Sequence, residues 1–306
     1  MTKILITGAT GFVGSSVLRH KCYKFRCVVR DTEEHSYHDY FTLDGIHAKT
    51  NWNGAFTDID SVIHLGGLAH NNTFTDKEYF EVNTEGTIHL ASEAIKAGVK
   101  RFVFVSSIGV NGTSTHDEAF TVQSSPKPHN TYAESKFRAE SGLFELAKNS
   151  GLEVVVIRPT LVYGKNAPGN FGSLIRLIHK LPLLPFGFAD NRRDFISVEN
   201  LADLLITCAI HPKAAGNIFL ASDGEAVSIK DFTTAIALGL GKTLIQLPIP
   251  ICFMRLVGKI LNKTIMIEQL VGNLEVDLSH TKEVLGWVPP YTMTQSMRSL
   301  SEKNDD

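Results

Sequence analysis

A glycine-rich turn near the start of the chain constrains the fold more than any other feature. The stretch ITGATGFVGSSV follows an apolar run at 3–7 and places Gly8, Gly11 and Gly14 at the mouth of a predicted helix, 12–20. Glycine lets the backbone turn tightly and lets a pyrophosphate approach, while the N–H groups and positive dipole end of the helix bind the phosphates. A glycine triplet alone is weak evidence, but the strand–turn–helix context predicts a dinucleotide-binding turn.

Short apolar runs alternate with helical patterns through the first two thirds of the chain. Further buried strands are predicted at 25–29, 61–65, 101–106 and 153–158, and long helices at 76–97 and 131–149. Such alternation is typical of an α/β fold, a Rossmann-type doubly wound parallel sheet with helices on both faces.

The regularity fades after residue 165, where prolines and glycines interrupt the chain. A strand entry with a helix returns at 195–210, and another strand follows at 217–222. We therefore expect a dinucleotide-binding domain at 1–165, rejoined by about 196–222. The segments 166–195 and 223–306 would form a smaller substrate-binding lobe.

The composition excludes several classes of protein. The net charge of −2 over 306 residues gives no basic footprint for nucleic acid. Four cysteines without close pairing predict reduced thiols in a cytoplasmic protein. We find no signal peptide and no spanning segment. The most apolar stretch, 244–261, is interpreted as an amphipathic helix packed on the protein rather than as a membrane-touching surface.

Acidic and histidine side chains gather at 33–40 in EEHSYHDY. His35 and His38 there lack a helical or paired-cysteine frame for a metal ion, so we expect a solvated loop and no metal site.

The second strand ends in CVVRD, where the adenosine ribose of a dinucleotide would lie. An acidic residue at this point favours NAD, whereas the guanidinium of Arg30 suits the 2′-phosphate of NADP. We therefore favour NADP(H), and NAD(H) stays open because Asp31 follows directly. Gly66 and Gly67, at the end of the strand 61–65, would let the cofactor cross the carboxyl end of the sheet.

The stretch NTYAESK contains a tyrosine and a lysine four residues apart, Tyr132 and Lys136, which share one face of the predicted helix. Ser106 and Ser107 end a buried strand upstream. A phenol has a pKa near 10, and a nearby ammonium together with a positive nicotinamide would lower it. Tyr132 could then exchange a proton with a sugar oxygen that Ser107 holds, while hydride moves at carbon.

The chain resembles the extended short-chain dehydrogenase/reductase family, close to UDP-sugar 4-epimerases and 4-keto-sugar reductases. The resemblance covers nearly the whole chain and rests on TGATGFVG, SVIHLGG, FVFVSSIGVNG, YAESK, RPTLVYG and RRDFISVENLADLL, all in the family's order. It implies that Ser107, Tyr132 and Lys136 are the catalytic triad, with Lys136 also on the nicotinamide ribose.

Further binding residues follow from the same resemblance. It places Asn170 and Arg193 on the diphosphate of a nucleotide sugar, with Ser107 also on the substrate. It also implies a homodimer built from the helices 76–97 and 131–149. The expected cofactor contacts are Gly8, Thr10, Gly11, Phe12, Val13, Gly14, Arg30, Asp31, Leu65, Gly66, Gly67, Ser106, Tyr132, Lys136, Pro159 and Val162.

Two departures from the family's pattern bear on the reaction. Related 4,6-dehydratases carry an acid pair where this chain has Ile108 and Gly109, which argues against elimination chemistry. The family's second, late arginine for the nucleotide has no clear match in QLVGNLEVDLSHTKEVLGW, so the carrier of the sugar stays open.

Three functions remain at this point. The first is reduction of the 4-keto group of a UDP-linked 6-deoxy-N-acetyl sugar in surface polysaccharide biosynthesis, with Tyr132 as proton donor. Arg30 supports it, since net reducers commonly use NADPH. The second is a 4-epimerase of a UDP-hexose or UDP-N-acetylhexosamine, with a variant that acts on a lipid-diphosphate sugar. The third is a non-catalytic NADP-binding sensor, against which the intact Ser107, Tyr132 and Lys136 argue.

Overall fold

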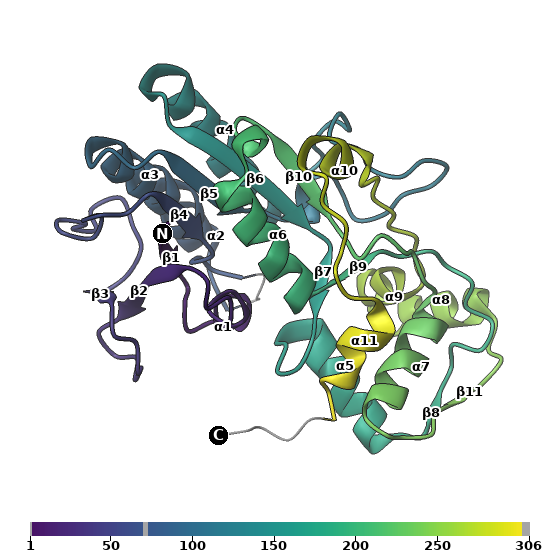
Figure 1. Cartoon of the computed structure of the whole chain (residues 1–306). Coiled ribbons are helices and arrows are strands. Elements are labelled where there is room, and N and C mark those ends of the chain that lie inside the picture. The colour runs from purple at the N-terminus through teal and green to yellow at the C-terminus, as the bar shows by residue number, and fades with distance from the viewer. Residues whose placement is uncertain (1, 70–72, 302–306) are drawn as a thin grey trace.

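A parallel sheet of seven strands forms the centre of the computed structural model, which describes residues 2–69 and 73–301 (Figure 1). The strands in spatial order are β10 (Ile218–Ala221), β6 (Glu153–Pro159), β5 (Arg101–Val105), β4 (Ser61–His64), β1 (Lys3–Thr7), β2 (Lys24–Arg30) and β3 (Tyr40–Leu43). The order reverses between β1 and β4, and ligands of such sheets bind at the carboxyl ends of the strands beside that switch point.

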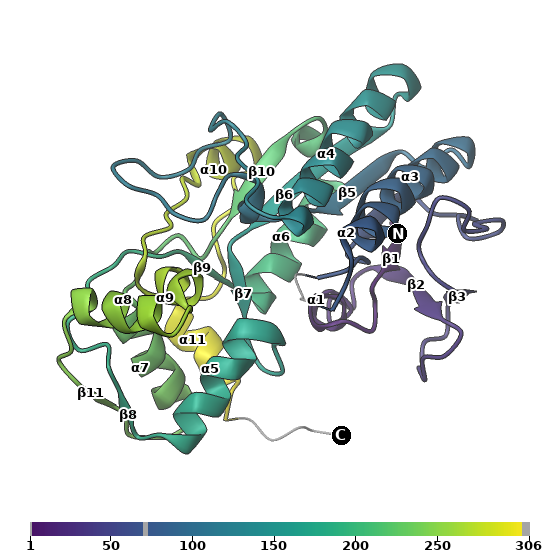
Figure 2. The same cartoon turned by 180° about the vertical axis from the view of Figure 1, so that it is seen from behind.

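Helices cover both faces of the sheet. The helical elements are α1 (Phe12–Val17), α2 (Asp76–Tyr79), η1 (Phe80–Gly86), α3 (Thr87–Lys96), η2 (Ile108–Val110), α4 (Thr131–Ser150), α5 (Gly169–Lys180), α6 (Val198–Ile210), η3 (Pro212–Ala214), α7 (Ile229–Gly239), α8 (Ile251–Ile260), α9 (Thr264–Val271), α10 (Ser279–Leu285) and α11 (Met293–Arg298). Helix α6 lies over the face seen in Figure 1, and α3 and α4 lie over the face seen in Figure 2. The predicted doubly wound α/β fold is confirmed.

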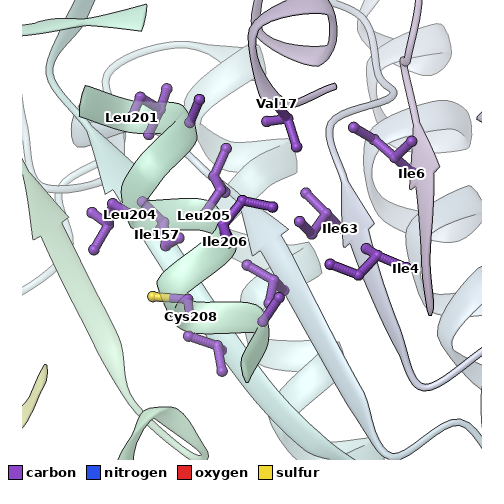
Figure 3. Close-up of a cluster of buried hydrophobic side chains, with 14 of the residues drawn as sticks. Ile4, Ile6, Val17, Ile63, Ile157, Leu201, Leu204, Leu205, Ile206 and Cys208 are labelled. Carbon is purple, nitrogen blue, oxygen red and sulfur yellow. The ribbon is translucent and has the colours of Figure 1, made fainter. Parts of the chain in front are cut away.

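Alternate side chains of β1 explain why both faces need covering. Ile4 and Ile6 pack with α6 in one cluster (Figure 3), whereas Leu5 packs with α3 and α4 in another. All three side chains are fully buried. A strand with apolar residues in both registers must be buried on both sides, which is what the continuous run KILIT predicts.

Some predicted boundaries differ from those of the structure. The helix predicted at 12–20 ends at Val17, and the one at 76–97 is interrupted by η1, a π-helical segment. Strand β3 was missed because it follows the polar stretch 33–40 directly. It is a four-residue edge strand that pairs with β2 on one side, so it carries no long apolar run.

The C-terminal part of the chain builds a cluster of its own. Two short parallel pairs lie there, β7 (Leu161–Tyr163) with β9 (Phe195–Ser197), and β8 (Leu183–Leu184) with β11 (Ile245–Gln246). The rings of Phe195 and Phe232 stack with their centroids 3.7 Å apart. However, Leu285 at the end of α10 and Trp287 just beyond it pack in the cluster of α6 and the sheet. The division into two domains stays a prediction.

Residues 2–69 and 73–301 contain neither a candidate membrane span nor a candidate metal site. No helix there is long and apolar enough to cross a membrane, and no group of three side chains there could hold a metal ion. All four cysteines are free thiols, of which Cys22 and Cys252 are exposed.

Candidate active site

A cavity of about 510 Å³, here called the site cavity, lies at the carboxyl ends of strands β5 and β6. Residues of the C-terminal helices α5, α7 and α9 also line it. It brings together five residues that the sequence singles out: Ser107, Tyr132, Pro159, Asn170 and Arg193. Much of the remaining wall is apolar. Among the additional lining residues are Ile108, Gly109, Thr113, His129, Leu161, Phe195, Phe232 and Met266.

Local backbone features fix Ser107 and Tyr132. Ser107 caps η2, and its hydroxyl accepts the Gly109 N–H at 3.1 Å. Tyr132 lies in the first turn of α4, where the Asn130 side chain caps the helix by accepting the Ala133 N–H at 2.8 Å. Both side chains line the site cavity, and hydrogen bonding by Ser107 favours the ionised form of the Tyr132 phenol and so lowers its pKa. The two proposed proton-handling hydroxyls therefore meet on the cavity wall.

The acidity of Tyr132 differs from the sequence-based expectation. Burial raises its pKa to about 12, and the hydrogen bond from Ser107 only partly opposes this. In the chain by itself, desolvation of the phenolate outweighs every favourable contact, and the lowering expected from the ammonium together with a positive nicotinamide stays a prediction.

Lys136 lies one helical turn beyond Tyr132 and is 95% buried, with 5% of its surface exposed. Its ammonium donates to the carbonyl of Val105 at 3.0 Å and lies 4.7 Å from the centre of the Phe104 ring. Burial lowers its pKa to about 8, although Glu140 opposes this. A Cβ on Gly67 would come within 3.5 Å of the ammonium, so the predicted glycine borders the lysine.

A buried polar network supports this helix from behind. The hydroxyl of Ser106 donates to the carboxylate of Glu140, which binds Arg158. Arg158 also donates to Asn111 at 3.0 Å. Ser106, predicted to contact the cofactor, is thus engaged beneath the cavity. The sequence reading missed Glu140, although its spacing of four from Lys136 continues the same helical face.

The glycine turn has the compactness that a dinucleotide requires. Gly8 has a φ of +69°, and a Cβ on Gly14 would lie 2.2 Å from the Gly8 carbonyl oxygen. Helix α1 can approach the turn only because this Cβ is missing. Gly11 caps α1 and offers no side chain to its first N–H groups, which leaves them for an anion. The turn therefore fits a pyrophosphate.

Four predicted cofactor residues pack into the protein core instead of standing free. Val13, Leu65 and Val162 pack against the cluster of α6 and the sheet, and Phe12 packs against the C-terminal cluster. They shape the walls around the turn through packing.

Arg30 is paired in a way that the sequence did not indicate. Its guanidinium lies 2.6 Å from the carboxylate of Glu33, which also accepts the hydroxyl of Thr10 at 3.1 Å. Although desolvation opposes it, hydrogen bonds from Arg30 and Thr10 lower the pKa of Glu33. Asp31 is exposed beyond the strand end. The acidic group beside the glycine turn is therefore Glu33.

Only one of the two adjacent arginines lines the cavity. Arg193 does so, and burial lowers its pKa to about 10. Arg192 points to the surface and pairs with Glu275 at 2.8 Å. Asn170 lies in the first turn of α5 and lines the same cavity.

Sequence comparison identifies the family. The profile of the "NAD dependent epimerase/dehydratase family" matches residues 4–221, more than half of the chain. The chain belongs to this family. The resemblance to extended short-chain dehydrogenases/reductases is thereby confirmed, and the protein is an enzyme of the epimerase/dehydratase type.

Individual members of this family match over nearly their full length. A UDP-glucose 4-epimerase of Vibrio cholerae is 42% identical over 98% of this chain and 94% of its own. The N-acetyl-alpha-D-glucosaminyl-diphospho-ditrans,octacis-undecaprenol 4-epimerase of Escherichia coli O157:H7 is 24% identical over 96% and 92%. The crystal structure of UDP-N-acetylglucosamine 4-epimerase from Bacillus cereus superposes with a TM-score of 0.79 at 19% identity, covering 98% of both chains. That last likeness concerns the fold.

Proposed function

We propose that this epimerase/dehydratase family member is a 4-epimerase of a UDP-linked hexose or N-acetylhexosamine that keeps NAD bound. The observation that carries the proposal is that Ser107 and Tyr132 line one cavity together with Arg193. The 42% identity to a UDP-glucose 4-epimerase supports this reaction rather than the reduction that the sequence reading favoured.

Tyr132 and Ser107 handle the sugar's 4-oxygen. Ser107 holds it by a hydrogen bond, and Tyr132 takes its proton and later returns it. The bound NAD supplies the oxidation at carbon 4 and the return of hydride. Tyr132 needs an adjacent positive charge to act as a base, because its pKa in the chain is about 12. Lys136, one turn away, is the group of this chain that supplies such a charge.

Another part of the cavity holds the carrier. Arg193 offers a guanidinium that can clamp one phosphate through two parallel hydrogen bonds. Its partial desolvation makes this contact stronger than it would be at the surface. Asn170 on α5, which lines the same cavity, also donates. The whole cavity, which these residues line together with Tyr132, has about 510 Å³ and leaves room for a keto sugar to turn over.

Glu33 supports NAD as the cofactor. A carboxylate beside Thr10 can accept hydrogen bonds from ribose hydroxyls, and it would repel a 2′-phosphate. It also neutralises Arg30, which was the reason to favour NADP(H). Reduction of a 4-keto sugar with NADPH, for which the sequence offers the family resemblance and Arg30, stays a prediction. The predicted homodimer and cytoplasmic location also stay predictions.

The test separates the two reactions. The purified protein is incubated with UDP-glucose or UDP-N-acetylglucosamine without added cofactor, and gluco/galacto products are quantified by chromatography. A second incubation contains NADPH and a UDP-4-keto-6-deoxy-N-acetylhexosamine. We expect interconversion in the first and no stoichiometric loss of NADPH in the second, with Tyr132→Phe inactive. Tyr132-dependent consumption of NADPH without interconversion would establish the reductase instead.

A further inference from the structure

Helices α8 and α9 expose a cluster of large apolar side chains. Figures 1 and 2 both show the two helices side by side, at the end of the molecule opposite to β3. The exposed fractions run from 50% for Met266 to 76% for Ile265. We call this cluster the α8–α9 surface; its members are Phe253, Leu256, Ile260, Leu261, Ile265 and Met266.

The packing of the helix pair does not require these residues. Met254 faces inward and joins the C-terminal core cluster. Gly258 lets α8 approach α9, since a Cβ there would lie 2.6 Å from Ile267. The two helices are thus held in place by residues outside the α8–α9 surface. The sequence predicts an amphipathic helix packed on the protein within 244–261, and α8 does pack through Met254, but its outer face carries large apolar side chains as well as Arg255 and Lys259. Six neighbouring exposed apolar residues are more than scattered exposure accounts for.

The stretch of chain that carries the α8–α9 surface is basic. The chain has no acidic residue from 232 to 267, a stretch that contains Lys242, Arg255, Lys259 and Lys263. Arg255 pairs with Glu268 at 2.8 Å. Within the described part of the chain, Lys259 and Lys263 form no salt bridge. Because the whole chain carries a net charge of −2, this basic stretch is a local asymmetry.

The α8–α9 surface continues into the site cavity. Met266 belongs to both, and Leu270, one turn further along α9, lines the cavity. Leu177 also lines the cavity and is 37% exposed. A molecule that covers the α8–α9 surface therefore lies at the rim of the site cavity.

We propose that the α8–α9 surface docks on a bilayer of anionic phospholipids and so places the site cavity at the membrane surface. An amphipathic helix with leucine, isoleucine and phenylalanine on one side and lysines along the edge is suited to lie in the headgroup region. The ten residues of α8 are half of the roughly 20 that a spanning helix needs, so the helix lies on the membrane.

Charge favours a lipid over a second copy of this chain. A two-fold contact through the α8–α9 surface would bring the unpaired Lys259 and Lys263 of both copies together, whereas anionic headgroups neutralise them. The docking does not depend on which reaction the cavity performs. If the epimerase assay failed, the docking proposal would still stand. If vesicle binding failed, the proposed reaction would still stand.

Sedimentation with vesicles tests the docking. The full-length protein is mixed at low ionic strength with vesicles of phosphatidylglycerol and phosphatidylcholine, or of phosphatidylcholine alone. We expect binding to the anionic vesicles that falls as salt rises. The pair Ile260→Asp and Ile265→Asp should lower the partition coefficient at least tenfold. Removing Lys259 or Lys263 should lower it roughly fivefold each. The control is Leu238→Asp, because Leu238 is 73% exposed but lies on α7, outside the α8–α9 surface. This variant should bind anionic vesicles as the unchanged protein does.

Two native thiols provide a second readout that needs no disruptive substitution. A polarity-sensitive fluorophore on Cys252, which is exposed on α8, should shift to the blue when anionic vesicles are added. The same label on Cys22 should not shift. Absence of sedimentation, or equal shifts at both thiols, would overturn the proposal. So would an Ile260→Asp variant that retains vesicle binding and instead dissociates a dimer in analytical ultracentrifugation.

Discussion

The carboxylate of Glu140 lies 2.5 Å from the guanidinium of Arg158, and the side chains of both are only 3% exposed. This ion pair joins α4 to β6 directly beneath the residues that line the site cavity. Glu140 also accepts the Ser106 hydroxyl, and Arg158 reaches Asn111. The helix that carries Tyr132 and Lys136 is thus tied to the sheet by a network without solvent contact.

The substitution Glu140→Ala should destabilise the protein strongly. It leaves the Arg158 charge buried without a counter-ion, which typically costs about 3–5 kcal/mol. Urea unfolding at pH 7 measures the change. The control Glu134→Ala removes a carboxylate from the same helix. Glu134 pairs with Arg138, and their side chains are 33% and 58% exposed, so the loss of unfolding free energy should stay below about 1 kcal/mol. If both variants lost a similar amount of unfolding free energy, burial of the Glu140–Arg158 pair would not be the cause of the loss.

Acid should destabilise the protein through His64. Its ring is buried between the hydroxyls of Thr7 at 2.7 Å and Thr87 at 2.9 Å, and burial lowers its pKa from 6.5 to about 3. Between these two values the unfolded chain binds a proton that the folded chain does not. Stability attributable to His64 therefore falls as pH drops from about 6.5 towards 3, by at most about 1.4 kcal/mol per pH unit.

Comparison with His64→Gln isolates this effect from the carboxylates that titrate in the same range. Glutamine can hydrogen-bond both threonines but does not ionise. The difference in unfolding free energy between the two proteins should shrink or reverse as the pH falls from 6.5 to 4. A difference that stays constant over this range would show that His64 does not titrate on unfolding.

Local patterns were sufficient to predict the architecture but not the pairing of charges. The run KILIT and the glycine turn lie within a dozen residues, so their meaning follows from short-range rules of backbone and burial. The pairing of Glu33 with both Arg30 and Thr10 depends on how the loop after β2 folds back to the glycine turn, 23 residues away from Thr10. No periodicity encodes such a contact, which is why Arg30 was interpreted as a free cation.

The pKa values were beyond sequence reasoning for the same reason. The spacing of Tyr132 and Lys136 predicts a shared face, and both lie on α4 as expected. It does not tell how deeply the face is buried. In the structure desolvation raises the pKa of Tyr132 and lowers that of Lys136, the opposite of what an exposed ion-pair geometry would give.

Cofactor preference should respond to Glu33. The variant Glu33→Ala removes a carboxylate beside Thr10 and frees Arg30, so the affinity for NADP should rise relative to NAD, on the order of tenfold. After removal of bound NAD, titration of the protein's fluorescence with each dinucleotide measures the ratio. Glu34→Ala removes the same charge from the exposed neighbouring position and should leave the ratio unchanged. A stronger effect at Glu34 would mean that overall charge decides the preference.

Removal of the phenol should abolish most of the turnover without loss of the fold. For Tyr132→Phe we expect kcat for UDP-sugar epimerisation to fall about 10²–10⁴-fold, since general acid–base catalysis by one positioned group contributes that much. The exposed Tyr291 provides the control, because Tyr291→Phe should retain full activity.

The pH dependence of kcat separates a catalytic role of Lys136 from a role in packing. Because the reactive form is the phenolate, kcat should rise with pH, and in Lys136→Met this limb should move to higher pH as the positive charge is lost. A Lys136→Met variant with reduced kcat and an unshifted limb would indicate that the lysine acts only through packing.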